Sequence, residues 1–138
     1  MKAWLLEQQR GIESLRLADA PDPKAGPGEV IVEIRYAALN PADRYLAEKL
    51  YPAHPPMPHV LGRDGMGAVV ELGPGADQFK LDQHVMVMRG DVGTNRWGTF
   101  AQRVAIPCDS LLPVPAGWTE QQSAGATLVY LTAHQALS

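Results

Sequence analysis

The chain has 138 residues, of which 46% are hydrophobic and 20% charged, and its formal net charge at pH 7 is -3. This composition is typical of one globular domain, and it argues against a disordered chain or a nucleic-acid partner. The single cysteine, Cys108, excludes an internal disulfide. No apolar run is long enough to span a bilayer. We therefore expect a cytoplasmic protein without nucleic-acid or membrane partners.

Short runs rich in Val, Ile and Leu, separated by Pro and Gly, predict a mainly β fold. In the clearest of these runs, residues 29–36, Val30 and Val32 alternate with Ile31 and Glu33. Because Ile31 is also apolar, this strand could be covered on both faces. In chain order, the predicted strands are 2–6, 15–18, 29–36, 68–72, 85–88 and 99–106.

Only two segments carry helical signals. Residues 41–49 form the first, with Asn40 at the capping position and Pro41 at the first helical position. The second begins near Thr119, where residues 119–122 have capping-box spacing, and it continues to the last residue. Since no Gly or Pro stop signal precedes Ser138, this run indicates a sequence truncated within a helix. A natural C-terminal docking helix is the alternative.

Three separated motifs follow one another in a fixed order. They read GEVIVEI at 28–34, ALNPAD at 38–43 and GRDGMGAVVELGPG at 62–75. In order and spacing they resemble the medium-chain dehydrogenase/reductase family. The closing YLTAHQAL at 130–137 is similar to the helix that joins that family's catalytic and nucleotide-binding domains.

The resemblance runs from the first residue to the last. It implies a GroES-like, partly open β-barrel with a few short helices over residues 1–120. Residues 121–138 would then be the start of the linker helix into a nucleotide-binding domain that lies beyond this sequence. One departure is clear, because the family's usual Gly-Asp-Arg-Val is replaced by a segment that begins at Asp82. Since Asp tolerates the left-handed region better than most residues, we expect this turn to be kept at a modest cost.

The resemblance also bears on metal binding. The zinc-dependent branch of the family places a Cys ligand where this chain has Asn40, and a His-Glu pair where it has Arg63 and Asp64. An amide and a guanidinium cannot replace a thiolate and an imidazole as zinc ligands. The structural zinc site of the family needs four cysteines. The histidines, which show no ligand spacing, are His54, His59, His84 and His134. We expect no zinc and no other metal.

The segment 40–43 is similar to the quinone-oxidoreductase branch, which uses NADPH. The resemblance therefore implies a homo-oligomeric, zinc-independent enzyme that transfers a hydride from NADPH to a quinone or an activated alkene or carbonyl. Conjugation spreads the negative charge that arrives with the hydride, so hydrogen-bond donors can replace a metal. Without the nucleotide-binding domain, we expect the isolated chain to be inactive and to bind NADPH weakly.

Position by position, the resemblance implies that Asn40, Tyr45 and Tyr51 are catalytic residues at the cleft. Asn40 would form a hydrogen bond near the nicotinamide or the substrate carbonyl, and Thr132 would touch the nicotinamide carboxamide. The two tyrosines would offer a hydroxyl for orientation and a ring for stacking. Arg63 is a weaker candidate, since it fills the position of a zinc ligand.

Each of these residues also has an ordinary structural interpretation. Asn40 could serve only as a helix cap, and Tyr45 and Tyr51 could be core or rim aromatics. Arg63 and Asp64 could be a charge pair in a solvated turn. Trp97 is more often a packing residue than a substrate wall.

At the level of function, a zinc-free alcohol dehydrogenase or an enoyl reductase would share this domain. A stand-alone GroES-like binding module is the alternative from another class.

Overall fold

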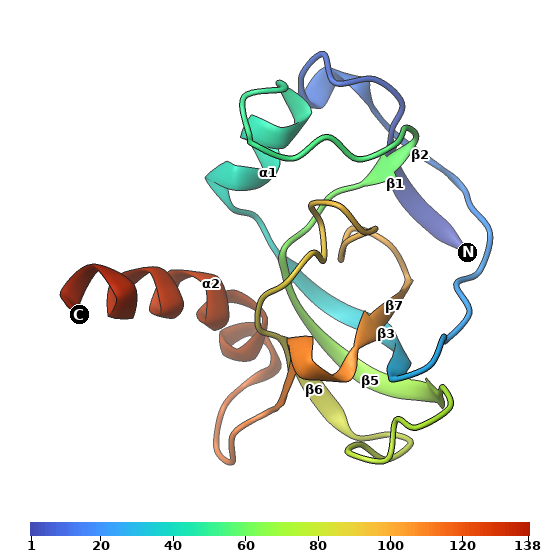
Figure 1. The fold of residues 1–138 in the computed structure, drawn as a ribbon, viewed down its shortest axis with the longest axis vertical. Coiled ribbons are helices and arrows are strands. Elements are labelled where there is room, and N and C mark those ends of the chain that lie inside the picture. The colour runs from blue at the N-terminus through green and yellow to red at the C-terminus, as the bar shows by residue number, and fades with distance from the viewer.

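A computed structural model describes residues 1–138, and it confirms the mainly β, GroES-like fold. One antiparallel sheet has the strand order β2-β1-β4 and the other has the order β7-β3-β5-β6-β8, so neither sheet closes into a barrel. Figure 1 shows the smaller sheet and helix α1 at one end of the molecule, while helix α2 projects from the body formed by the larger sheet.

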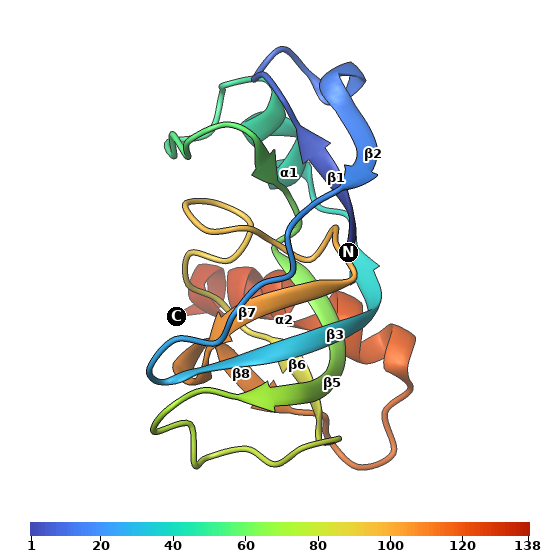
Figure 2. The same cartoon turned by 90° about the vertical axis from the view of Figure 1, so that its right-hand side faces the viewer.

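The strands are β1 (Lys2–Leu6), β2 (Leu15–Asp19), β3 (Glu29–Ala38), β4 (His59–Val60), β5 (Asp64–Leu72), β6 (His84–Val87), β7 (Arg103–Pro107) and β8 (Leu111–Pro113). The helices are α1 (Pro41–Ala47) and α2 (Glu120–Leu137), and two 3-10 turns are η1 (Ile12–Ser14) and η2 (Cys108–Ser110). Figure 2 views the larger sheet with β3 and β7 in front of α2.

All six predicted strands are present, and the differences lie at their ends. The strand predicted from residue 99 begins only at Arg103, because the backbone N–H groups of Thr99 and Phe100 donate to Gly62 and Leu61 instead of a neighbouring strand. Strand β5 begins at Asp64, earlier than predicted. Its first residues are rich in glycine, which hides the apolar signal of the strand.

The main core lies against the five-stranded sheet and is almost wholly apolar. Val30, Val32, Val69 and Ile106 are fully buried within it. Ile31 points to the other face of β3 and is also buried, so this strand is covered on both faces at that position. Two register irregularities interrupt the pairing of β3 with β5. Such bulges bend a strand, and here they precede the segment that enters α1.

Two turns contain a residue other than glycine with a positive φ. Asp82 has a φ of 63°, and its N–H donates to the carbonyl oxygen of Val69 at 2.8 Å, so the turn is kept without glycine as expected. Helix α1 ends at Ala47, two residues before the predicted end. Lys49 adopts a φ of 61° and the N–H of Leu50 returns to the carbonyl oxygen of Tyr45, which closes the helix.

Helix α2 has a buried beginning and an exposed end. The predicted capping box is present, since the Thr119 hydroxyl accepts from the N–H of Gln122 and the Gln122 side chain accepts from the N–H of Thr119. Ala124 and Thr127 are buried on the sheet, whereas Tyr130 is 63% exposed. Neither helix combines the length and the hydropathy that crossing a membrane would require.

Candidate functional site

A cleft of about 530 Å³ lies between the start of α1, the loops before β4 and β5, and the outer part of α2. It is lined by Asn40, Pro41, Ala42, Tyr51, Arg63, Leu128, Val129, Thr132, Ala133 and Ala136. Apolar side chains form most of its wall, and a few polar groups are added to them. This combination is typical of sites for small organic ligands.

Asn40 is held in this cleft by a hydrogen bond that fixes the orientation of its amide. It occupies the N-cap position of α1, and its backbone N–H donates to Oδ2 of Asp43 at 2.9 Å. Its side-chain Nδ2 donates to Oδ2 of Asp64 at 3.0 Å. Because an ionised carboxylate can only accept, the nitrogen of the amide must face Asp64. The carbonyl oxygen of the amide therefore faces the start of α1, where it takes part in the capping box with the Asp43 backbone.

The Asp64 carboxylate is the central acceptor where the start of α1, the start of β5 and helix α2 meet. We call this set of buried hydrogen bonds the junction. Oδ1 lies 2.8 Å from the hydroxyl of Thr127 and 3.3 Å from the backbone N–H of Leu128, both on α2. The Thr127 hydroxyl also approaches the carbonyl oxygen of Val87 on β6. With a relative exposure of 1%, Asp64 is not in a solvated turn and makes no ion pair with Arg63. Here the interpretation as a surface charge pair is wrong, because the Asp64 carboxylate is turned inward to these donors.

A second buried carboxylate, Asp43, supports the same junction from α1. It accepts hydrogen bonds from the backbone N–H groups of Asn40 and Gly62. Burial raises the pKa of Asp43 above its usual range. Hydrogen bonds from the backbone oppose that rise, and the nearby Asp64 carboxylate adds to it. These contacts tie the start of α1 to the Gly62–Arg63 backbone.

Arg63 and Tyr51 form a polar pair that also lines the cleft. The Arg63 Nη1 donates to the Tyr51 hydroxyl oxygen at 2.8 Å, and its Nη2 makes a longer contact of 3.5 Å with the carbonyl oxygen of Gly90. The guanidinium carbon lies 5.7 Å from the centre of the Tyr51 ring. The Nε of Arg63 is buried and has no hydrogen-bond partner.

Of the two remaining predicted site residues, Thr132 lies in the cleft and Tyr45 lies outside it. Thr132 lines the cleft, and its hydroxyl donates to the carbonyl oxygen of Leu128, one turn earlier, at 2.8 Å. Tyr45 lies on α1, is 48% exposed and does not line the cleft. The structure thus brings Asn40, Tyr51 and Thr132 together with Arg63, and it leaves Tyr45 outside.

A stack of glycine backbones supports the loop that carries Arg63. Gly62 has a φ of 106°, and its carbonyl oxygen accepts from the N–H of Thr99. A Cβ atom added at Gly93 or Gly98 would lie 2.3 or 2.2 Å from that oxygen, so no side chain fits at either position. Trp97, between these glycines, packs near β1, and its Nε1 donates to the carbonyl oxygen of Pro58, which is the predicted packing role.

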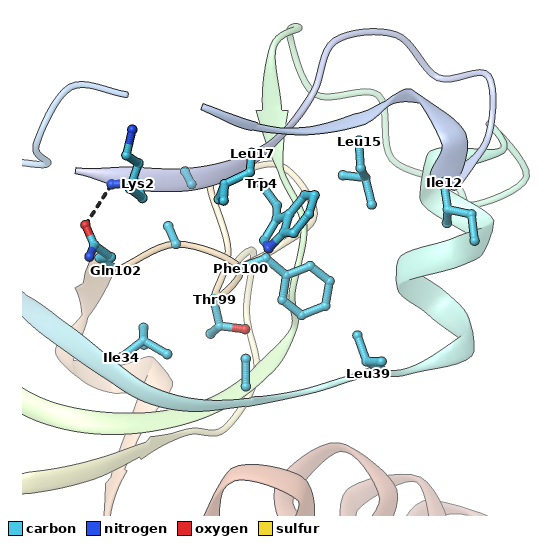
Figure 3. A pocket seen from close by; sticks show the side chains of 13 residues that line it. Lys2, Trp4, Ile12, Leu15, Leu17, Ile34, Leu39, Thr99, Phe100 and Gln102 are labelled. Carbon is cyan, nitrogen blue, oxygen red and sulfur yellow. Dashed lines mark hydrogen bonds between the residues drawn. The ribbon is translucent and has the colours of Figure 1, made fainter. Parts of the chain in front are cut away.

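A larger hollow, of about 740 Å³, lies on another part of the surface. Figure 3 shows Trp4, Leu15 and Leu17 from the small sheet facing Ile34 and Leu39, with the Phe100 ring between them. Its only charged side chain is Lys2. This apolar groove was not predicted from the sequence, and it lacks the convergent polar groups of the cleft.

Residues 26–116 match the family described as the alcohol dehydrogenase GroES-like domain. The chain belongs to the medium-chain dehydrogenase/reductase family. Among its relatives is the synaptic vesicle membrane protein VAT-1 homolog of Rattus norvegicus, which is 32% identical over 129 residues. That match covers 92% of this chain and 30% of the relative.

Solved structures of this family agree closely with the fold. A crystal structure of an NAD-dependent alcohol dehydrogenase gives a TM-score of 0.89 at 33% identity, over 98% of this chain and 46% of that one. A quinone oxidoreductase from Pseudomonas syringae pv. Tomato gives 0.88 at 29% identity, over 99% of this chain and 40% of that one. The chain therefore spans less than half the length of these relatives.

The donor groups of this family member do not fit a catalytic zinc ion. Such a site needs three ligands of the Cys, His or carboxylate type. No group of three or more His, Cys, Asp or Glu side chains is gathered in the structure in a way that could hold a metal ion. On the cleft, Asn40 offers an amide and Arg63 a guanidinium, while the Asp64 carboxylate is occupied by Asn40 and α2.

Proposed function

We propose that this chain is the substrate-side domain of a zinc-independent, NADPH-dependent oxidoreductase that transfers a hydride to a quinone or an activated alkene or carbonyl. The observation that carries the proposal is the fixed amide of Asn40 on a cleft shared with Tyr51 and Thr132. The likeness to a solved quinone oxidoreductase supports the substrate class.

Asn40 and Thr132 are suited to hold the carboxamide of a nicotinamide. The Asn40 nitrogen is used by Asp64 and the Thr132 proton by Leu128, so each side chain still offers an oxygen, and that of Asn40, which also caps α1, keeps one lone pair. A carboxamide NH2 group carries two donors that match two acceptors. Bound NADPH would supply the hydride, and these two residues would orient the ring that carries it.

Tyr51 is suited to receive the reducible carbonyl of the substrate. Its oxygen already accepts a hydrogen bond from Arg63, so its own proton remains free to be donated. A donor at the carbonyl oxygen stabilises the negative charge that develops there as the hydride arrives. The apolar wall of the cleft excludes water around a flat substrate. Tyr45 lies outside the cleft, so we give it no step in this scheme.

The test uses the full-length protein that carries this chain, purified, treated with a chelator and mixed with NADPH. We expect NADPH oxidation with a quinone or enone, unchanged by the chelator. Replacing Asn40 by Ala should lower kcat/KM by about tenfold or more, because a positioned hydrogen bond is lost. Thr132→Val should act mainly on the KM for NADPH. Turnover of simple alcohols alone, or activity restored only by zinc, would contradict the proposal.

The isolated chain of 138 residues serves as the control. Half of a cleft cannot hold donor and acceptor carbons in near contact, so we expect no quinone turnover from it. Measurable turnover by this chain alone would show that the active site needs no second domain.

A further inference from the structure

We propose that Arg63 makes this cleft selective for substrates that carry an anionic group, a carboxylate or sulfonate, on their flat reducible part. The inference rests on the proposed function, since it specifies the substrate class of the same cleft. Its basis is a guanidinium that lines the cleft and has no charged partner within the chain.

Five arginines form ion pairs, namely Arg16, Arg35, Arg44, Arg96 and Arg103. Arg10, Arg63 and Arg89 form none, and of these three only Arg63 lines the cleft. Two carboxylates adjoin Arg63, since Asp64 is the next residue and Asp43 accepts a hydrogen bond from the Arg63 backbone, and both are already used. Asp43 accepts from backbone N–H groups, and Asp64 accepts from Asn40 and α2. The positive charge of Arg63 is therefore balanced by no acidic side chain in contact with it.

The hydrogen bonds of Arg63 are made only to neutral acceptors. A guanidinium has five N–H donors, and here only two contacts are made, to the Tyr51 hydroxyl and to the carbonyl oxygen of Gly90. Its Nε is buried and unpartnered. A partly buried cation in this state is stabilised most by a ligand that brings both a negative charge and hydrogen-bond acceptors.

Tyr51 orients the guanidinium of Arg63 beside the cleft. Its ring and the guanidinium carbon are 5.7 Å apart, and its hydroxyl oxygen already accepts from Arg63. The guanidinium N–H groups that remain can therefore meet the two oxygens of one carboxylate, while the Tyr51 proton stays available for the reducible carbonyl. Arginine is the residue best suited to such planar, two-point recognition.

The apolar wall beside Arg63 and Tyr51 indicates the chemistry of the uncharged part of the ligand. Pro41, Ala42, Leu128 and Val129 give the cleft an apolar surface next to the Arg63–Tyr51 pair. Only a ligand with a flat apolar part and an anionic substituent satisfies both surfaces. We infer an aromatic or enone carboxylate, or the corresponding sulfonate, as the substrate class.

Naphthoate and the neutral, similarly shaped naphthamide test this inference without redox chemistry. Both are titrated into the isotope-labelled chain, and the NMR signals of the Arg63 Nε–H group and of all backbone amides are followed, among them Asn40, Leu128 and Thr132 at the cleft. We expect naphthoate to bind about tenfold more tightly than naphthamide, as charge-assisted hydrogen bonds predict. Arg63→Gln should remove this preference, whereas Arg16→Gln, which removes the same charge from β2, should keep it.

Arg63→Lys covers the case in which the Gln variant does not fold. It keeps the charge but loses the planar fork, so it should retain a reduced preference for naphthoate. Equal binding of the two ligands at the cleft would overturn the anion selectivity and leave the proposed cleft intact. Signal changes confined to residues outside the cleft, such as Trp4 and Leu17 in the apolar groove, would overturn both.

Discussion

The apolar core under the five-stranded sheet and the polar junction beside the cleft are built on different principles. In the core, residues such as Val69 and Ile106 are fully buried among other apolar side chains. In the junction, Asp43, Asp64 and Thr127 are equally hidden from solvent but are held by hydrogen bonds. Apolar burial has no direction, whereas a hydrogen bond fixes the orientation of its partners. The core therefore stabilises the fold, and the junction orients the cleft.

The largest effect is expected from a substitution in the apolar core that leaves the junction unchanged. Ile106→Ala removes a side chain with no solvent exposure, and we expect it to lower the free energy of unfolding by about 2–5 kcal/mol. Chemical denaturation measures this loss. Under native conditions the amide signals of Asn40 and Leu128 should stay unchanged. A loss well under 1 kcal/mol, or a rearranged cleft, would contradict the division between the two regions.

Asp64→Ala breaks the junction instead. It leaves the Leu128 N–H without its acceptor and removes one of the two acceptors near the Thr127 hydroxyl, and we expect a loss of about 1–3 kcal/mol. Hydrogen exchange should quicken along α2 before it quickens in β3. Asp64→Asn is the matched control, because its amide oxygen can still accept from α2. Uniform loosening of the whole chain in the Ala variant would show that Asp64 acts as part of the general core.

A smaller effect depends on pH and concerns His59 on β4, which is buried. Burial lowers the pKa of His59, and a hydrogen bond to Gly93 partly opposes this. In the unfolded chain His59 takes up a proton near its ordinary pKa of 6.5, while in the folded chain it stays neutral to lower pH. Below that value the unfolded state binds more protons, so the stability contributed by neutral His59 is present at neutral pH and lost as the pH falls.

Denaturation at about pH 7.5 and about pH 5 measures this contribution, and His59→Gln should show a shallower fall than the original chain. Carboxylates such as Asp22, whose pKa is lowered by the N-terminal ammonium group, contribute to both proteins and cancel in the comparison. Identical falls in the two proteins would mean that His59 is accessible to protons in the folded state.

The smallest effect is expected at the surface of the junction. Arg35 on β3 donates to Glu120 at the start of α2 at 2.6 Å, and both side chains are partly exposed. Exposed pairs contribute little, so Arg35→Gln should cost less than about 1 kcal/mol, and added salt should shrink the cost further. A cost as large as that of Asp64→Ala would make the surface pair, and not the buried carboxylate, the main anchor of α2.

Much of the fold could be predicted from the sequence because it is determined by local pattern. The alternating residues of β3 and the capping signals around Asn40 and Thr119 each act within a few positions. Strands β4 and β8 were missed, since they contain two and three residues and carry no period. The start of β5 was missed because Gly65 and Gly67 contribute no apolar side chain.

The candidate site was predictable only in part. Family resemblance indicated Asn40, Tyr51 and Thr132, which meet at the cleft. The partnership of Asp64 and Thr127 joins residues 63 positions apart, and only the tertiary fold brings them together. Thr127 lies in a run of small residues where nothing in the sequence marks it for such a contact. The charge of Arg63 was visible, but its lack of an acidic partner was not.

The packing of Gly93 and Gly98 against Gly62 also determines which positions near Arg63 tolerate substitution. A loop with glycines at 93 and 98 looks like a flexible connection that would accept many substitutions. Its backbone instead rests on the carbonyl oxygen of Gly62, so even a methyl group at either glycine would displace the segment that carries Arg63. Between them, Asn95 is exposed to solvent. Substitutions in this loop should therefore be tolerated at position 95 and not at either glycine.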